Sequence, residues 1–350
     1  MSIENKQTGI IKILEARIAD GTYQDKLPKT LDLVNEFDVN FKTLNKAILQ
    51  LVNRGVLYRK PGRGTFVAGE TKKLEESLIE LLFVGSSEMI THPFYSETWR
   101  GIFDGIHGAE FKLVLTTLEE NKKRGGLKSV CKDLTPSAGK ILIGTNNTEQ
   151  IKGLKRSKVP FILVNEQSDL PDVISVHTDT GPAITAAINY LRKLKIKDIA
   201  YIGQTSADGE HLLSLNKFHS YLAAIQKKGK LNSDLIENTP PFARCGYESM
   251  KKILKRQVPQ ALILAYDHLA PGVYEAINEF GLKIPEDIKI IGIDGINPNV
   301  TPALTSIPIN RYATGLAAGQ QLVAMIRNSR KKYKSQILPT EFDPKLGASI

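Results

Sequence analysis

Basic residues, with no acidic residue among them, occupy a short stretch near the N-terminus. Between Val39 and Val67 every charged side chain is positive, and these are Lys42, Lys46, Arg54, Arg59, Lys60 and Arg63. The residues from Asp20 to Asp38 carry five acidic side chains, so the positive charge is local. Ammonium and guanidinium groups bind phosphate oxygens. The cluster predicts a polyanionic partner such as nucleic acid, with an ordinary solvated surface as the alternative.

A second group of polar and aromatic side chains follows short apolar runs in the C-terminal part of the chain. These positions are Phe94, Tyr95, Asn165, Tyr266, Asp267 and Asp294. Flat aromatic rings stack on the faces of pyranose sugars, and carboxylates accept hydrogen bonds from hydroxyl groups. The combination favours a sugar site, although an aspartate at the end of a strand is also a common turn residue.

Signatures of catalysis and of metal binding are absent from the sequence. It contains no GxGxxG, GxxxxGK[ST], HExxH or GxSxG motif. None of the six histidines lies four residues from another, and the two cysteines, Cys131 and Cys245, are far apart in the chain. We therefore expect no enzymatic activity, no bound metal and no cofactor.

Three helices and a hairpin are expected to position the basic residues. Apolar residues at helical spacing predict helices over 10–19, 27–37 and 41–53, with Asn40 as the N-cap of the third. Short extended runs then flank the turn Lys60-Pro61-Gly62-Arg63-Gly64. This order is the pattern of a winged helix-turn-helix. In that arrangement the third helix lies in the major groove of DNA, and the hairpin tip contacts phosphates or the minor groove.

From Leu78 onward, short apolar runs alternate with helical stretches. Each run is almost entirely apolar, as in a parallel sheet buried on both faces. This alternation predicts a doubly wound α/β fold, whose ligand sites lie beyond the carboxyl ends of the strands. The predicted strands are 78–84, 112–115, 140–143, 161–164, 199–202, 261–265 and 289–293, and the predicted helices include 98–105, 181–194, 215–228 and 272–280.

The N-terminal segment resembles the GntR family of bacterial regulators over about residues 10–68. The resemblance lies in IADGTYQDKLPKTLDLVNEFDVNFKTLNKAILQLVNRGVL and in the wing YRKPGRGTFV. The chain departs from the family pattern at Leu31, where arginine is usual, and at Asn40-Phe41, which replaces Ser-Arg. The resemblance implies DNA contacts from Lys29, Asn40, Lys42, Thr43, Lys46, Arg63 and Gly64.

The C-terminal segment, about residues 78–349, resembles the LacI-type effector domain, which is built like periplasmic sugar-binding proteins. The resemblance lies in HPFYSETWRGI, SVHTDTGPAITAAINYLRKLKIKDIAYIG and YDHLAPGVYEAINEFGLKIPEDIKIIGIDGI, among other pieces. The family's effector-binding arginine corresponds to Lys217, a point charge in place of a planar fork. The resemblance implies effector contacts from Phe94, Tyr95, Asn165, Lys217, Phe242, Tyr266, Asp267 and Asp294.

These expectations combine into an α/β fold class with two domains. A winged helix-turn-helix (1–68) and a linker (69–77) precede a two-lobed, periplasmic-binding-protein-like domain (78–350) of doubly wound parallel sheets. We expect lobe 1 at about 78–177 and 310–329, and lobe 2 at about 178–309 and 330–350. The chain would then cross between the lobes near 176–179, 308–311 and 328–332.

The whole pattern resembles bacterial arabinose repressors and predicts a cytoplasmic, homodimeric transcriptional regulator. Its partners would be double-stranded operator DNA and a monosaccharide, such as arabinose or fucose, bound between the lobes. No membrane association is expected, since the N-terminus has no apolar signal segment and the longest apolar runs, such as Ala261 to Tyr266, are short. A sugar-binding protein or sensor that does not bind DNA directly is the alternative.

Overall fold

The protein divides into two compact units, Met1–Leu78 and Ile79–Ile350. The computed structural model describes residues 3–60, 62–68, 77–85, 90–118, 136–145, 147–206, 212–227, 230–239 and 246–350. Within these ranges, no helix has the length and apolar character that crossing a lipid bilayer requires.

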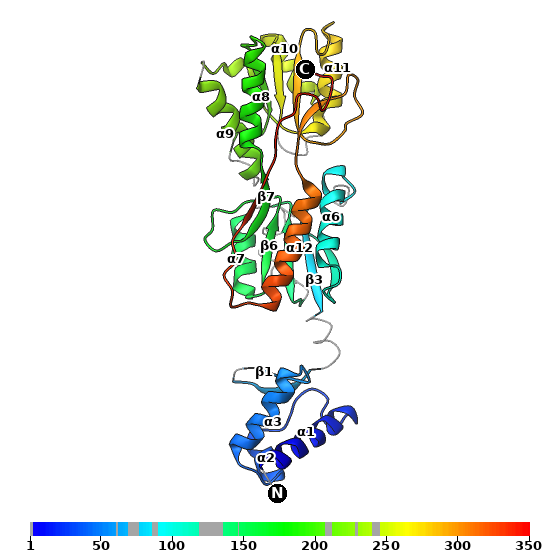
Figure 1. Cartoon of the computed structure of the whole chain (residues 1–350), viewed down its shortest axis with the longest axis vertical. Coiled ribbons are helices and arrows are strands. Elements are labelled where there is room, and N and C mark those ends of the chain that lie inside the picture. The colour runs from blue at the N-terminus through cyan, green and yellow to red at the C-terminus, as the bar shows by residue number, and fades with distance from the viewer. Residues whose placement is uncertain are drawn as a thin grey trace. The chain divides into compact units, whose positions relative to one another are not determined.

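The N-terminal unit is a three-helix bundle with a two-stranded wing, which confirms the predicted winged helix-turn-helix (Figure 1). Its elements are α1 (Ile3–Ala19), α2 (Thr30–Glu36), α3 (Phe41–Asn53), β1 (Leu57–Lys60) and β2 (Gly64–Val67). The strands pair in antiparallel fashion, and Leu14, Leu33 and Leu44 are fully buried between the helices. Helix α2 begins later than predicted because the Leu27 N–H donates to the Thr65 carbonyl (2.9 Å), which holds that segment against the wing.

The larger unit contains two parallel sheets, here called lobe 1 and lobe 2, which confirms the predicted α/β class. The sheet of lobe 1 has the strand order β13-β7-β6-β5-β3-β4. Helices α6 and α12 pack against each other in this lobe. The elements of lobe 1 are β3 (Leu78–Val84), α6 (Pro93–Ile106), β4 (Lys112–Leu118), β5 (Gly139–Ile143), α7 (Thr148–Ser157), β6 (Phe161–Val164), β7 (Ser175–Asp179), α12 (Arg311–Arg327) and β13 (Gln336–Pro339).

Lobe 2 is built on a five-stranded sheet with the order β12-β11-β10-β8-β9, in which all the pairs are parallel. Its core is fully buried around Tyr201, Ile263 and Ile291. The elements of lobe 2 are α8 (Gly181–Lys193), β8 (Ile199–Gly203), α9 (Leu212–Gln226), η3 (Ser233–Leu235), β9 (Ile236–Asn238), α10 (Tyr247–Arg256), β10 (Ala261–Leu264), η4 (Asp267–Leu269), α11 (Ala270–Glu279), β11 (Lys289–Asp294) and β12 (Thr305–Pro308).

Three segments connect the lobes. The chain crosses between β7 and α8, and again between β12 and α12. The third crossing follows Pro339, because β13 pairs with β7 in lobe 1 while the Ser349 carbonyl accepts from the Ile290 N–H in lobe 2 (2.7 Å). The predicted crossing at 328–332 and the placement of 330–339 in lobe 2 are therefore wrong. Strand β13 (QILP) is short and mostly exposed, so no apolar run marks it in the sequence.

Helices α6 and α12 pack with their backbones almost in contact. A Cβ atom added to Gly101 of α6 would lie 2.1 Å from the carbonyl oxygen of Tyr312. A Cβ atom added to Gly315 of α12 would lie 2.2 Å from the carbonyl oxygen of Thr98. Only glycine fits at these two positions, because a backbone atom cannot give way as a flexible side chain can. We call this contact the glycine seam.

Candidate functional sites

Helix α3 presents two lysines to solvent. Lys42 and Lys46 are both exposed and lie about one helical turn apart. The helix begins at Asn40, whose Oδ1 accepts from the Thr43 backbone N–H (2.8 Å) and from the Thr43 hydroxyl (2.9 Å). Thr43 is only 8% exposed. Asn40 is thus the N-cap that the sequence predicts, and Thr43 supports the cap, while the two lysines are the cationic groups of this helix.

The wing ends in a narrow cationic turn. Arg63 is exposed, and Gly64 has a φ of +114°, a backbone conformation that favours glycine. The Lys60 ammonium lies 5.3 Å from the ring centroid of Tyr58 and 5.1 Å from that of Phe66. A tip of this shape and charge suits phosphate oxygens or the minor groove.

The helix and the wing are joined by a contact that the sequence analysis does not assign. Arg59 of β1 donates to the Asn45 side chain of α3. Lys29 is exposed at the N-cap position of α2. Leu31 and Phe41, the two apolar residues that depart from the family pattern, are the most exposed large apolar side chains among the described residues of this unit, with Leu31 69% and Phe41 61% exposed. This surface therefore combines separated cations with apolar side chains.

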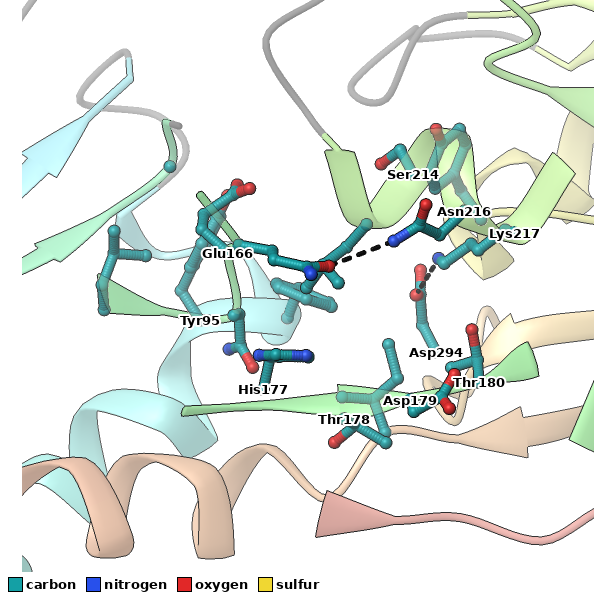
Figure 2. Close-up of a pocket in the computed structure, with 18 of the residues that line it drawn as sticks. Tyr95, Glu166, His177, Thr178, Asp179, Thr180, Ser214, Asn216, Lys217 and Asp294 are labelled. Atoms are coloured by element: carbon teal, nitrogen blue, oxygen red, sulfur yellow. Dashed lines mark hydrogen bonds and ion pairs between the residues drawn. The ribbon is translucent and has the colours of Figure 1, made fainter. Parts of the chain in front are cut away.

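A cavity of about 260 Å³ lies between lobe 1 and lobe 2, at the carboxyl ends of their strands (Figure 2). This is where doubly wound sheets bind ligands. Its volume is close to the lower end of the range for small-molecule sites. The predicted effector residues that line it are Phe94, Tyr95, Asn165, Lys217, Tyr266 and Asp294.

Lys217 and Asp294 form a buried ion pair in the lobe 2 wall of this cavity. The Lys217 Nζ lies 3.0 Å from Asp294 Oδ1 and donates to the Ala265 carbonyl at 2.7 Å. It also lies 4.8 Å from the centroid of the Tyr266 ring. The two charged side chains are 7% and 5% exposed. Asp294 has a φ of 140°, which is rare for a residue with a Cβ and is the kind of strain found at functional sites.

Asp267 lies behind the wall of the cavity and does not line it. Its carboxylate accepts from the Ser306 hydroxyl (2.7 and 2.9 Å) and from the Ile296 backbone N–H (2.8 Å). Burial raises the pKa of Asp267, and the nearby charge of Asp294 raises it further. The predicted direct contact with an effector is therefore corrected to a supporting role, since Asp267 holds the loop that follows β11. Phe242, also predicted, lies outside the described residues.

Several polar side chains line the cavity that sequence reasoning does not assign. The Asn165 Oδ1 and the Thr178 Oγ1 are buried and have no hydrogen-bond partner among the described residues, as expected of atoms that a polar ligand would satisfy. Thr178 and Asp179 end strand β7 (SVHTD), whose polar sequence hides it from a search for apolar runs. The unassigned polar residues are Gln167, His177, Thr178, Asp179, Thr180, Ser214, Asn216 and His268, and the cavity is also lined by His92 and Glu166, which the sequence places beyond strand ends near Phe94 and Asn165.

The described lining is acidic on balance. Burial lowers the pKa of His92 and of His177, so both rings are neutral at pH 7. The charged residues of the lining are Glu166, Asp179, Lys217 and Asp294. Lys217 is paired with Asp294, so Glu166 and Asp179 are the acidic side chains of the described lining that remain outside this pair, while Arg311 adds a positive charge next to Phe94 and Asp294.

The two lobes touch across the cavity. Asn216 of α9 donates to Gln167 of lobe 1 at 3.2 Å, as the longer dashed line in Figure 2 shows. The rings of His92 and His268 meet edge to face, with their centroids 5.5 Å apart. Arg311, the first residue of α12, donates to the backbone carbonyl of Asp294. The walls of the cavity are therefore connected by side chains as well as by the three crossings.

Metal binding finds no support in the described part of the chain. No group of three or more histidine, cysteine, aspartate or glutamate side chains gathers there in a way that could hold an ion.

Two family models match the chain. The gntR family of bacterial regulatory proteins matches residues 6–67, and the periplasmic binding protein-like domain matches residues 188–346. The chain thus carries a gntR-type helix-turn-helix domain followed by a periplasmic-binding-protein-like domain. Both resemblances predicted from the sequence are confirmed.

Curated relatives of similar length are transcription regulators. The arabinose metabolism transcriptional repressor of Halalkalibacterium halodurans is 24% identical over 355 residues, which cover 94% of this chain and 91% of that protein. Catabolite control protein A of Priestia megaterium is 27% identical over 236 residues, which cover 65% of this chain and 70% of that protein. The chain is therefore similar to a repressor over nearly its full length.

Solved structures share the two-lobed fold. The complex of the transcriptional regulator CelR with cellobiose has a TM-score of 0.70 at 18% identity and covers 89% of this chain and 90% of that chain. A LacI family regulator from Enterococcus faecium with bound ribose has a TM-score of 0.64 at 23% identity and covers 77% of this chain and 98% of that chain. The likeness places this chain in the same architecture.

Proposed function

We propose that this chain is a DNA-binding repressor of sugar-utilisation genes whose operator affinity is changed by a monosaccharide. Residues 1–68 would bind the operator through Lys29, Lys42, Lys46, Arg63 and Gly64, with Asn40 and Thr43 at the start of the recognition helix. Residues 78–350 would bind the sugar and dimerise. The observation that carries the proposal is the cavity between hinged lobes in a chain that also contains a winged helix-turn-helix.

The charge of the cavity supports an uncharged effector. A sugar phosphate or a sugar acid would have to break the pairing of Lys217 with Asp294 and then face the carboxylates of Glu166 and Asp179. A neutral sugar avoids this cost, because its hydroxyl groups can donate to carboxylates and accept from the lysine. We propose a monosaccharide such as arabinose or fucose.

The proposal includes a cytoplasmic homodimer. One recognition helix reads only a few base pairs, so two copies are needed to define an operator. The half-sites are then expected to lie about 10 bp apart, or a multiple of that distance, because they must face the same side of the duplex. Enzymatic activity is not part of this proposal, and the relatives named above are regulators.

A binding assay tests the proposal. Duplexes are selected from a random library at low salt, and binding of the wild-type protein is followed by fluorescence anisotropy with and without arabinose, fucose or arabinose 5-phosphate. We expect arabinose or fucose to change the Kd for DNA by about 5- to 150-fold, as is typical of allosteric coupling. Sugar binding without any duplex binding would favour the sensor that does not bind DNA. A response to the phosphate alone would contradict the uncharged effector.

A further inference from the structure

We propose that lobe 1 carries a second DNA-binding surface, which contacts the phosphate backbone of the duplex that flanks the operator. This inference rests on the proposed function, since it requires an operator-bound protein. The surface is the edge of lobe 1 at which its parallel strands begin, on the side away from the cavity, and we call it the basic edge.

The basic edge is built from the segment between α12 and β13 and from the end of α7. The first segment is NSRKKYKS together with the last residue of α12, and the second includes the last turn of α7 and the residue after it. All of their basic side chains are exposed. They are Lys155, Arg156, Lys158, Arg327, Arg330, Lys331, Lys332 and Lys334.

These cations are not neutralised by carboxylates in the described part of the chain. Lys155 donates to the Pro171 carbonyl and Arg327 to the Ala109 carbonyl, while Lys331 lies over the Tyr333 ring. By contrast, the buried Lys140 of the same lobe forms an ion pair with Glu80. The carboxylates in the described connections of this edge are Glu110, Asp169 and Asp172. Among the described residues, the edge therefore carries a large excess of positive charge.

The sheet topology places this charge at the edge of lobe 1 where β3 begins, and β3 is the first strand that the structure describes after the N-terminal unit. Strands β13, β7, β6, β5 and β3 are parallel, so residues that precede β13 and β6 lie at the same edge as Leu78, which begins β3. Figure 1 shows the end of α12 and the start of β3 at the same end of lobe 1. Only residues 69–76 separate Ala68 from Ser77, a contour of about 30 Å at most when fully extended.

The short linker between the two units, residues 69–76, favours duplex DNA over other polyanions as the partner of the basic edge. When residues 1–68 bind an operator, the flanking phosphates are held within a few tens of ångströms of the basic edge, which raises their effective concentration. Duplex DNA carries about one charge per 1.7 Å of its axis, so a short flank supplies a long row of partners. Contacts of this kind carry no sequence information and add affinity for longer duplexes.

The test compares two duplexes and two variants. The operator core alone and the same core extended by about 20 bp on each side are bound by the wild type, by Arg330→Gln/Lys331→Gln/Lys332→Gln, and by Lys193→Gln/Lys195→Gln/Lys197→Gln. The second triple variant removes equal charge from exposed positions of lobe 2 and is the matched control. Sugar binding, followed by thermal shift, reports that both variants are folded.

The wild type is expected to bind the extended duplex more tightly than the core, and the lobe 1 variant to lose most of that gain. Its salt slope on the extended duplex should fall by about 0.9 for each phosphate that the variant no longer neutralises, with core binding unchanged. If the lobe 1 variant binds both duplexes as tightly as the wild type does, the basic edge does not contact DNA. The same conclusion follows if the lobe 2 control variant loses as much affinity as the lobe 1 variant. Failure of the wild type to bind either duplex would overturn the proposed function and this surface with it.

Discussion

Lys217 and Asp294 satisfy each other before any ligand arrives. Each is buried, so the loss of either partner would leave an uncompensated charge in the wall of the cavity. A ligand is therefore selected by whether it extends this pair with hydrogen bonds or must break it. We therefore expect charge to decide first which effectors bind, and we expect the aromatic side chains at the start of α6 to contact a sugar face.

Truncation of Phe94 should weaken sugar binding. Phe94 lines the cavity at the start of α6, so Phe94→Ala is expected to lower the affinity about tenfold or more, equivalent to about 1.4 kcal/mol. Isothermal titration calorimetry measures the effect. Phe103→Ala removes an exposed phenylalanine from the same helix, outside the cavity lining, and serves as the control. Equal affinity in Phe94→Ala and the control would place the sugar elsewhere.

His177 should make the stability depend on pH. In the unfolded chain its imidazole titrates near pH 6.5, whereas burial lowers the pKa in the folded protein. Above about pH 6.5 both states are neutral. Below it the unfolded chain binds the proton first, so the free energy of unfolding falls as the pH drops toward the lower, folded-state pKa.

Urea unfolding at pH 7.5 and pH 5.5 tests this effect. The variant His177→Asn is expected to lose less stability between these pH values than the wild type does, because it lacks the titrating ring. Burial of Asp267 acts in the opposite direction in both proteins, since its raised pKa favours the folded state as the pH falls, so the difference between the proteins isolates His177. An identical pH dependence in both proteins would contradict the assignment.

The residues that could be predicted from the sequence are those that follow a recognisable strand. Asn165 and Asp294 come directly after apolar runs, so their place at a strand end is readable. Asp267 shows the limit, because the sequence does not tell on which side of a wall a carboxylate points. Glu166 is readable together with Asn165, because both follow the same apolar run, whereas Asp179 escapes sequence reasoning because it ends a polar strand.

Among the secondary-structure elements, the start of α3 is where helix stability and DNA binding can be tested at the same residue. Asn40 has two candidate roles, as the helix cap seen here and as a DNA contact. Asn40→Ala should lower the free energy of unfolding of the N-terminal unit by about 1 kcal/mol, because it removes the cap.

The variant Asn40→Ser separates the two roles. Serine caps helices nearly as well as asparagine, so stability should return close to that of the wild type. If Asn40→Ser also restores operator binding, loss of the cap explains any weaker operator binding by Asn40→Ala. If operator binding stays weak while stability is restored, the asparagine amide contacts DNA. Thermal unfolding and anisotropy are measured on both variants. Wild-type stability in Asn40→Ala would contradict the cap.

Elements with clear periodicity can be predicted well, and elements without it cannot. Helix α3 has the predicted bounds, since its buried leucines recur at helical spacing. Strands β7 and β13 carry no such signal, because one is polar where it meets the cavity and the other is exposed. Without β13 the third crossing is misplaced, so an error in one short strand becomes an error in the division of the lobes.

At the level of the whole sensor unit, we expect sugar binding to depend on how closely the two lobes approach each other around the cavity. Asn216 and Gln167 meet across it, so their contact exists only when the walls are close. Gln167→Ala or Asn216→Ala should weaken sugar binding by up to about tenfold, the value of one net hydrogen bond, without lowering the free energy of unfolding. Calorimetry and urea unfolding measure the two quantities.

The control for this prediction is Gln226→Ala, which removes an exposed amide at the far end of the same helix. Sugar affinity equal to that of the control in both cross-lobe variants would show that this contact does not contribute to closure.

Because of the glycine seam, we expect α6 and α12 to move together as one rigid body. Because the two backbones meet at Gly101 and Gly315, we expect a shift of α12 at Arg311, where the chain passes between the lobes, to move α6 and its residue Phe94 as well. Gly101 and Gly315 are therefore positions at which any larger side chain would disturb the packing of lobe 1, although neither lines the cavity. A substitution at either glycine is expected to force α6 and α12 apart and to displace the residues that α6 contributes to the cavity.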